Sequence, residues 1–345
     1  MDALKNRFHS IYPDKFFLDY SIKEVNDYLS DQNWLLDAEY VLGLEKPGEG
    51  NMNLVMRVKT NLKNLILKQS RPWVEKYPYI EAPVERIHVE AAYFSAISKE
   101  PTLRAYSPEI LGYDPLNFVT LYNDLGKSSD FTFLYDRSKR LLNSEKKDLL
   151  IYLSALHHLN CPDFPFNQPM RKLNHEYIFK VPFMVNNGLD LDRIQTGLSD
   201  ASIPFKNNRY LHKALDNLGK FYLKEGPVLI HGDYFPGSWL RSASGIKIID
   251  PEFSFKGFAE FDVGVMIAHM VMSGQGEEMA KSILDEYEQR EDFDLRLLSG
   301  FAGTEILRRI LGVAQLPLSL TLEEKINVMR MAKEWILNQS IDFMI

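Results

Sequence analysis

The chain has few of the features that mark secreted or membrane proteins. Cys161 is the only cysteine among 345 residues, so no disulfide can form within the chain. No apolar run approaches the roughly 20 residues needed to span a bilayer. Residues 1–7 lack the apolar core of a secretion signal. The sequence therefore predicts a cytoplasmic protein with no membrane partner.

The chain also lacks an excess of positive charge, internal repeats and low-complexity segments. It carries 40 Lys and Arg against 47 Asp and Glu, a formal net charge of −7. Nucleic-acid binding needs a basic face, so we expect no nucleic-acid partner. The composition, 45% hydrophobic and 25% charged, is that of a globular protein. The length allows one large domain or two lobes.

The first third of the sequence has the pattern of a small α+β unit. Ser21 and Glu24 have the spacing of a capping box, which predicts a helix start. Alternating or continuous apolar runs bounded by turn residues predict strands, and apolar positions repeating every three or four residues predict a helix. The predicted elements are a helix over 21–30, two strands within 38–59, strands over 62–69 and 118–122, and a helix over 87–97.

The remainder is mostly helical by the same criterion. The predicted helices cover 148–159, 207–223, 261–272, 279–287, 298–311 and 321–338. We expect a bilobal α+β fold with an antiparallel sheet in a small N-terminal lobe, residues 1–124. A larger, mainly helical C-terminal lobe follows over 125–345, with the hinge near 122–127. Clefts between lobes are favoured ligand sites.

The most informative motif is the run His231-Gly232-Asp233-Tyr234-Phe235-Pro236-Gly237-Ser238, followed by Asp250-Pro251-Glu252-Phe253. The segment between them predicts a hairpin over 239–249, which would bring Asp233 close to Asp250. Phosphoryl transfer needs a carboxylate that orients the attacking hydroxyl, and Asp233 is our candidate. The alternative is that Asp233 only caps its own turn.

Asp250 and Glu252 are the candidate magnesium ligands. In an extended backbone, residues i and i+2 project to the same side, and Mg²⁺ takes one or two carboxylates together with phosphates and water. Ser238 is a third candidate ligand, or else a cap of the turn. The alternative for the acidic pair is a set of salt bridges at a strand end.

A second candidate region lies in the first third of the chain. Glycines at Gly48 and Gly50 would let backbone amides approach a triphosphate. Lys68 would bridge its phosphates and pair with Glu90 on the following helix. The alternatives are a plain hairpin turn and a solvated lysine. The candidate nucleotide-binding residues are Gly48, Gly50, Asn51, Asn53, Lys68 and Glu90, with Tyr122 and Asp124 at the hinge.

Three further groups of polar residues occur in the helical part. Arg308 and Arg309 have apolar residues on both sides, which indicates a half-buried, functional pair with Glu305 within reach. His157-His158 lacks further zinc ligands, so we interpret it as a pair of core histidines. Asp262 opens a predicted helix, and we expect it to brace the His-Gly-Asp turn.

At these residues the chain resembles the aminoglycoside phosphotransferase and choline kinase superfamily, and more closely the 5-methylthioribose kinase family. That family has a His-Gly-Asp-Leu-His-Thr-Gly-Ser run and an Asp-Pro-Glu-Phe motif, similar to residues 231–238 and 250–253 here. Segments 48–55, 254–264 and 308–312 also resemble it. Tyr234-Phe235 replace its usual Leu-His, and Tyr122-Asn123 stand where a Glu is common.

The resemblance implies a protein-kinase-like fold and an ATP- and Mg²⁺-dependent kinase that phosphorylates a sugar hydroxyl, most plausibly of 5-methylthioribose. It implies that Arg308 and Arg309 hold the sugar and that a homodimer is possible. Aminoglycoside, choline or homoserine acceptors stay open; Trp239, Tyr234 and Phe235 could contribute to an aromatic cage for choline. The alternative of another class is a nucleotide-binding pseudokinase.

Overall fold

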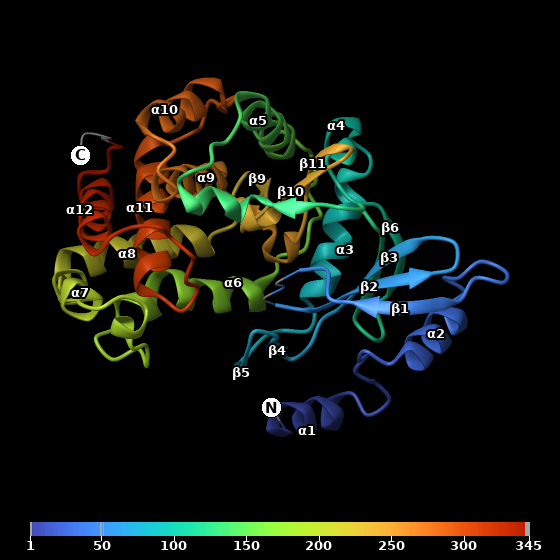
Figure 1. The fold of residues 1–345 in the computed structure, drawn as a ribbon. Coiled ribbons are helices and arrows are strands. Elements are labelled where there is room, and N and C mark those ends of the chain that lie inside the picture. Colours follow the sequence, from blue (N-terminus) through green and yellow to red (C-terminus); the bar gives the residue numbers. More distant parts are fainter. Residues whose placement is uncertain (1, 49, 51, 342–345) are drawn as a thin grey trace. The chain divides into compact units, whose positions relative to one another are not determined.

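The computed structural model describes residues 2–48, 50 and 52–341, and Figure 1 traces its helices and strands. Two compact units make up the chain. The sheet unit comprises Met1–Ser128 and Ser242–Glu252, and the helical unit comprises Ser129–Arg241 and Phe253–Ile345. The chain therefore passes from one unit to the other three times. The sequence suggested one boundary near residue 124, and nothing in the local pattern indicated that residues 242–252 return to the first unit.

The sheet unit is built on five antiparallel strands in the order β1-β2-β3-β7-β6. The strands are β1 (Val41–Glu45), β2 (Leu54–Thr60), β3 (Asn64–Gln69), β6 (Ile110–Asp114) and β7 (Val119–Asn123). Along β2 buried and half-buried positions alternate, as expected of a strand with one fully covered face. Leu54, Met56 and Val58 enter a core that also includes Val25 and Leu29 of helix α2.

Helices and short strands complete the sheet unit. They are α1 (Asp2–Ile11), α2 (Ile22–Asp31), α3 (Arg86–Ile97), α4 (Pro101–Ala105), β4 (Trp73–Val74), β5 (Tyr77–Glu81) and β11 (Gly245–Ile248). Most side chains of α3 are buried, among them the charged Arg86 and Glu90. A helix buried nearly all round is expected to be apolar, so these two charges need partners.

The helical unit contains eight α-helices among its described residues. They are α5 (Asn143–His157), α6 (Gln168–His175), α7 (Leu198–Lys206), α8 (Arg209–Leu223), α9 (Ala259–Met272), α10 (Glu277–Glu286), α11 (Leu295–Leu311) and α12 (Leu322–Asn338). Helices α9 and α11 pack closely, because a Cβ on Gly264 would lie 3.1 Å from the backbone nitrogen of Ala302. The short strands here are β8 (Ser129–Asp130), β9 (Val228–Ile230), β10 (Trp239–Ser242) and β12 (Phe255–Gly257).

The α+β prediction is confirmed, and so are the long periodic elements. The side chain of Ser21 accepts a hydrogen bond from the backbone N–H of Glu24 at the start of α2, and Thr321 with Glu324 forms a full capping box on α12. The sequence analysis missed the helices α1, α4, α6 and α7 and the strands β4, β5, β6, β8, β9 and β12. These are short, and short elements carry weak periodic signals.

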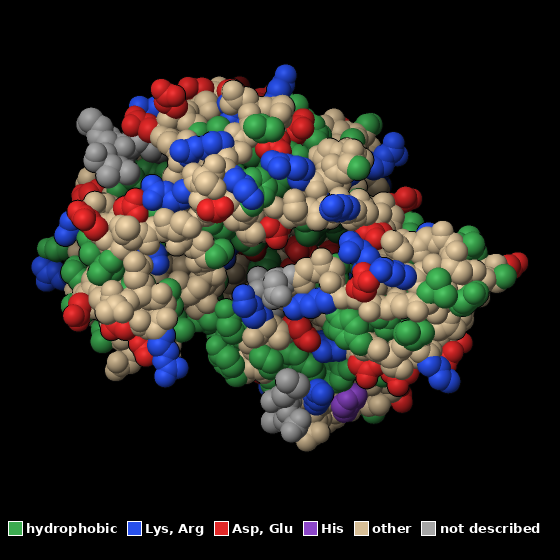
Figure 2. All heavy atoms as spheres, viewed as in Figure 1, with side chains coloured by type: hydrophobic (Ala, Val, Ile, Leu, Met, Phe, Trp, Pro, Cys, Tyr) green, Lys and Arg blue, Asp and Glu red, His purple; other side chains and the backbone are tan. Residues whose placement is uncertain are grey.

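Helix lengths and surface charges bear on two expectations from the sequence, that no segment spans a membrane and that no basic face is present. Among the described residues, no helix is long and apolar enough to cross a membrane. On the face drawn in Figure 2, Lys and Arg side chains are interspersed with Asp and Glu side chains. That face therefore carries no extended field of one sign.

Candidate active site

The His-Gly-Asp turn lies at the end of a short antiparallel pair in the helical unit. Strand β9 pairs with β12, with Ile230 opposite Phe255, and the chain leaves β9 directly into His231. Gly232 has φ +82°, and a Cβ there would lie 2.3 Å from the carbonyl oxygen of Phe253. Both the left-handed backbone and the close approach require glycine. The sequence therefore specifies this turn locally.

Asp262 braces the same turn, as the sequence predicted. Its carboxylate accepts the backbone N–H of His231 at 2.6 Å and of Gly232 at 2.9 Å. Nε2 of His157 lies 3.3 Å from Asp262, and Nδ1 of His157 lies 2.7 Å from the hydroxyl of Tyr287. His157 is buried, which confirms the prediction of a core histidine. Its neighbour His158 is exposed, so for that residue the core prediction is wrong.

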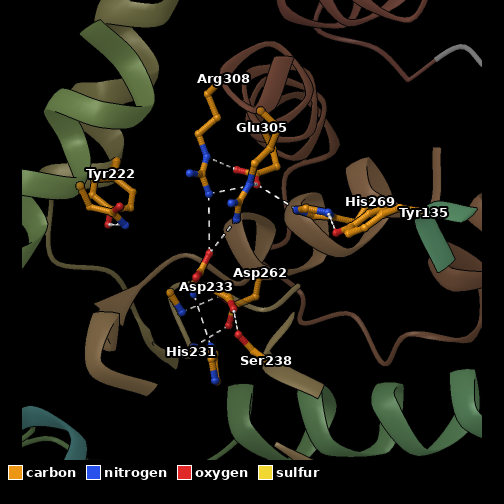
Figure 3. Close-up of polar contacts among 12 residues, drawn as sticks. Tyr135, Tyr222, His231, Asp233, Ser238, Asp262, His269, Glu305 and Arg308 are labelled. Carbon is orange, nitrogen blue, oxygen red and sulfur yellow. Dashed lines mark hydrogen bonds and ion pairs between the residues drawn. The ribbon is translucent and has the colours of Figure 1, made fainter. Parts of the chain in front are cut away.

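Asp233 follows the turn with its backbone and side chain in different roles. Its carbonyl oxygen accepts a hydrogen bond from Oγ of Ser238 at 2.8 Å. Its carboxylate lies 3.2 Å from Nη2 of Arg309 and 3.6 Å from Nη2 of Arg308 (Figure 3). Burial raises the pKa of Asp233, and the charges of Arg309 and Arg308 lower it in part. The result is a carboxyl group with a pKa above its usual range beside two guanidinium groups.

The two arginines share one carboxylate on their own helix, α11. Nε of Arg309 lies 2.7 Å from Oε1 of Glu305, and Nη2 of Arg308 lies 3.0 Å from the same oxygen. Nε of Arg308 also donates to Oε2. Burial alone would raise the pKa of Glu305, but Arg308, Arg309 and a hydrogen bond from His269 hold it well below its usual range. Both arginines are buried, more deeply than the half-buried pair that the sequence predicted.

A second cluster lies within the sheet unit, around Lys68 on β3. Nζ of Lys68 lies 2.6 Å from Glu90 and 2.7 Å from Asp250. The hydroxyl of Tyr122 donates to Glu90 at 2.6 Å. Burial raises the pKa of Glu90 to about 7, against the opposing effect of Lys68. Burial would lower the pKa of Lys68, but Asp250 and Glu90 bring it above its usual range. The predicted Lys68–Glu90 pair is present.

The Asp-Pro-Glu segment differs from the extended conformation that we expected. Asp250 has φ +60°, a left-handed conformation that Asp tolerates better than most residues, and a 3-10 turn covers Pro251–Phe253. The two carboxylates consequently have different partners. Asp250 is half exposed and pairs with Lys68, whereas Glu252 is buried and lies 3.1 Å from Nε of Arg86.

Arg86 is a site residue that the sequence analysis missed. Its side chain is fully buried. Besides Glu252, it contacts Oδ1 of Asn53 at 2.9 Å, and its terminal nitrogens donate to the carbonyl oxygens of Met52, Arg71 and Pro83 at 2.6–2.9 Å. One guanidinium therefore ties the end of the glycine-rich segment to the acidic motif. The signal in the sequence was a charged residue at the start of a mainly apolar helix.

The glycine-rich segment is described in part, because Asn51 lies outside the described residues. A Cβ on Gly48 would meet no described atom within 4 Å, so packing does not require glycine there. The amide of Asn53 donates to Glu252 at 2.8 Å and its oxygen accepts from Ser70 at 3.1 Å. Asn53 is buried, and its side chain therefore acts as a brace for Glu252.

Three other candidate residues have their side chains engaged elsewhere. Tyr234 and Trp239 are fully buried; the hydroxyl of Tyr234 donates to the carbonyl oxygen of Leu149, and Trp239 packs edge-on against Phe131. Neither side chain presents a face to a ligand. The third suggested cage residue, Phe235, is half-buried, and its ring faces the guanidinium of Arg309. The carboxylate of Asp124 at the predicted hinge pairs with Arg57 at 2.9 Å.

The sheet unit contains carboxyl groups that could serve as metal ligands. Glu90, Asp250 and Glu252 supply three carboxyl groups against the two cations Lys68 and Arg86. Oxygen ligands and an excess of negative charge suit Mg²⁺, which fills its remaining positions with phosphates and water. In the structure these carboxylates are paired with Lys68 or Arg86, and among the described residues no three acidic, His or Cys side chains are placed together to hold a metal ion.

Comparison with known proteins identifies the family. Residues 43–301 match the phosphotransferase enzyme family, APH. The chain belongs to this family. It is an ATP-dependent phosphotransferase that acts on a hydroxyl group, and the sequence prediction of such an enzyme is confirmed.

Individual relatives agree with this assignment. A methylthioribose kinase from Exiguobacterium sibiricum is 28% identical over 324 residues, covering 78% of this chain and 79% of that protein. One from Geobacillus is 24% identical over 328 residues, with 79% and 78% covered. The structure of a choline/ethanolamine kinase family protein from Mesorhizobium loti superposes with a TM-score of 0.54 at 17% identity, covering 92% of this chain and 97% of that one. The protein-kinase-like fold expected from the sequence is thereby confirmed.

Proposed function

We propose that this phosphotransferase transfers the γ-phosphoryl group of Mg²⁺-ATP to a hydroxyl of 5-methylthioribose. The observation that carries the proposal is the carboxylate of Asp233, held on a braced turn beside Arg308 and Arg309. The relatives named methylthioribose kinase, which match over most of the chain, support the choice of acceptor.

In this proposal Asp233 is the catalytic residue. Its carboxylate accepts a hydrogen bond from the acceptor hydroxyl and aligns it for attack on the γ-phosphorus. Arg308 and Arg309 donate hydrogen bonds to the sugar hydroxyls and stabilise the charge that develops in the transition state. Ser238 keeps the turn in shape through the carbonyl oxygen of Asp233, so we assign it a supporting role in place of a metal ligand.

The sheet unit would bind the nucleotide. Lys68, oriented by Glu90, would contact the phosphates, and backbone amides near Gly48 and Gly50 would approach them. Backbone groups around Tyr122 would receive the adenine, since the side chain of Tyr122 is committed to Glu90.

Asp250 would be the principal ligand of Mg²⁺, because its carboxylate is half exposed. Glu252 would supply a second oxygen while it stays paired with Arg86. The bound ion would neutralise charge on the phosphates.

The charge balance of the residues proposed to bind the acceptor favours an uncharged acceptor. Asp233 and Glu305 together match Arg308 and Arg309, so the group of four is neutral overall. A polycationic aminoglycoside would need an excess of acidic groups there, and choline would need exposed aromatic faces. A neutral sugar with several hydroxyls needs only directed donors and acceptors.

The test is ADP production from Mg²⁺-ATP with 5-methylthioribose, choline, homoserine and kanamycin offered separately. We expect turnover on 5-methylthioribose and at most slight turnover on the other three. Turnover confined to another acceptor would refute the choice of substrate and retain the phosphotransferase activity. ATP binding without turnover on any acceptor would support the pseudokinase alternative.

A further inference from the structure

Glu305 is the common anchor of the arginine pair in the helical unit. Its Oε1 accepts from three donors: Nε of Arg309 at 2.7 Å, Nη2 of Arg308 at 3.0 Å and Nε2 of His269 at 3.0 Å. Its Oε2 accepts from Nε of Arg308. Glu305 is buried, so water cannot replace a donor that is lost. The orientation of both guanidinium groups therefore depends on how this one carboxylate is held.

His269 holds the carboxylate from the opposite side, on helix α9. Its ring is fully buried between Glu305 and Tyr135, whose hydroxyl lies 2.6 Å from Nδ1 (Figure 3). Burial lowers the pKa of His269 to about 4, so the imidazole is neutral near pH 7 and carries one N–H. A carboxylate only accepts hydrogen bonds. The proton therefore belongs on Nε2, and Nδ1 accepts the hydroxyl proton of Tyr135.

Tyr135 is well suited to fix this tautomer. Burial raises the pKa of Tyr135 well above its usual range, so its hydroxyl keeps the proton that it donates to Nδ1. Phe235 adds a packing constraint. The guanidinium of Arg309 lies 4.5 Å from the centre of the Phe235 ring, and the His269 ring centre lies 5.3 Å from it. Arg309 is thus held by Glu305, Asp233 and an aromatic face.

We propose that Tyr135 and His269 are positioning residues that act through Glu305 to keep Arg308 and Arg309 oriented for the acceptor. The assignment of the acceptor rests on the proposed function. The relay also limits how far the arginines move toward Asp233, whose carboxylate attracts them. Without His269, Glu305 can rotate, and the guanidinium groups can approach Asp233 more closely than the 3.2 and 3.6 Å of the intact site. The acceptor then has to displace a tighter ion pair in order to bind.

The kinetic test compares His269→Leu with His269→Gln and Thr304→Ala. Leucine removes the donor to Glu305, whereas the amide nitrogen of glutamine can restore it. Thr304 is a matched control on α11, because its hydroxyl donates to the carbonyl oxygen of Gly300 within the same helix. A hydrogen bond to a charged group corresponds to roughly tenfold or more in an equilibrium.

We expect His269→Leu to raise the KM for the acceptor about tenfold, with the KM for ATP within about twofold of wild type. His269→Gln should recover most of that loss, and Thr304→Ala should leave both constants unchanged. Tyr135→Phe should raise the acceptor KM less than His269→Leu does. Combined with His269→Leu, it should raise that KM little further. Equal effects on both KM values, or a lowered melting temperature with normal kinetics, would overturn the proposal.

An NMR measurement on the wild-type protein tests the relay without any turnover. The ¹⁵N shifts of His269 at pH 7 should show a neutral ring with the proton on Nε2, and the Nε–H signals of Arg308 and Arg309 should exchange slowly. In His269→Leu those arginine signals should broaden or exchange faster. A proton on Nδ1, or arginine signals unchanged by His269→Leu, would overturn the relay. If the wild type instead phosphorylates a different acceptor, only the substrate assignment fails, and the same KM comparison is made with that acceptor.

Discussion

At the scale of single residues, the partners of a side chain decide its role more than its type does. Asp233, Asp250 and Asp262 are all aspartates of the same motif region. Asp262 accepts two backbone N–H groups, Asp250 pairs with Lys68, and Asp233 is the one whose carboxylate lies beside an arginine pair. For this reason our proposal gives Asp262 a bracing role, Asp250 a metal-binding role and Asp233 the catalytic role.

The first prediction concerns Asp233 itself. Asp233→Asn keeps the shape of the side chain and removes the charge that accepts the acceptor proton. We expect kcat to fall by a factor of about 10² or more while the Kd for Mg²⁺-ATP changes little, because the proposed nucleotide residues lie in the sheet unit. Single-turnover kinetics and isothermal titration measure the two quantities. Near wild-type kcat would exclude Asp233 as the catalytic residue.

The second prediction concerns the pH dependence of the reaction. Burial raises the pKa of Asp233, and Arg309 opposes that shift. Removing this cation should therefore raise the pKa of Asp233 further. In Arg309→Gln the acidic limb of kcat/KM should move to higher pH, since the reaction needs the deprotonated carboxylate.

The control is Arg209→Gln on α8, where the arginine is exposed and contacts Tyr210. Its pH profile should coincide with that of the wild type. An acidic limb that stays in place in Arg309→Gln, or moves to lower pH, would show that another group governs it.

At the scale of elements, the candidate site residues of each unit are linked to a helix through buried charged side chains. The His-Gly-Asp turn is attached to α9 through Asp262, and the arginine pair extends from the last turn of α11. In the sheet unit, α3 supplies Glu90 to Lys68 and Arg86 to Glu252. The catalytic geometry of each unit thus depends on one or two packed helices.

The third prediction tests the attachment of α3. Arg86→Met removes one member of a fully buried ion pair and leaves Glu252 without its cation. Breaking such a pair costs about 3–5 kcal/mol, so the urea concentration at the midpoint of unfolding should fall clearly. The affinity for Mg²⁺ should change as well. Arg7→Met is the matched control, because Arg7 pairs with Glu81 at the surface and should cost less than about 1 kcal/mol. Equal losses in the two variants would contradict the role given to Arg86.

At the scale of the whole molecule, two units share the proposed reaction. The chain enters the sheet unit a second time at Ser242–Glu252, and this return brings Asp250 and Glu252 to Lys68 and Arg86. The nucleotide groups therefore belong to one unit, although Lys68 and Asp250 are 182 positions apart in the sequence, and the acceptor groups belong to the other.

The fourth prediction follows from that division. A ligand that binds only the folded state stabilises it by about 2.7 kcal/mol at 100 times its Kd. Mg²⁺-ADP should therefore raise the melting temperature, and the rise should disappear when EDTA removes the metal. Lys68→Met should reduce the shift, whereas Arg309→Gln should keep it. A shift that survives in Lys68→Met but is lost in Arg309→Gln would reverse the proposed division of labour.

Much of the architecture followed from local sequence patterns. The periodicity of 298–311 and 321–338 located α11 and α12 to within a few residues, and the capping residues Ser21 and Thr321 located helix starts. The His-Gly-Asp run indicated both a turn and a catalytic carboxylate. These features are local, because backbone conformation at a turn or cap depends on a few neighbouring residues.

The sequence by itself determined the long periodic elements and the residue types that carry the chemistry. Only the tertiary structure decided their partners: Arg86 with Glu252, His269 with Tyr135 and Glu305, and the burial of Trp239. Contacts between residues far apart in the chain depend on how whole elements pack, and no short stretch of sequence encodes that packing. Phosphotransfer chemistry was therefore foreseeable from the motifs, whereas the relay behind the arginine pair became visible only in the fold.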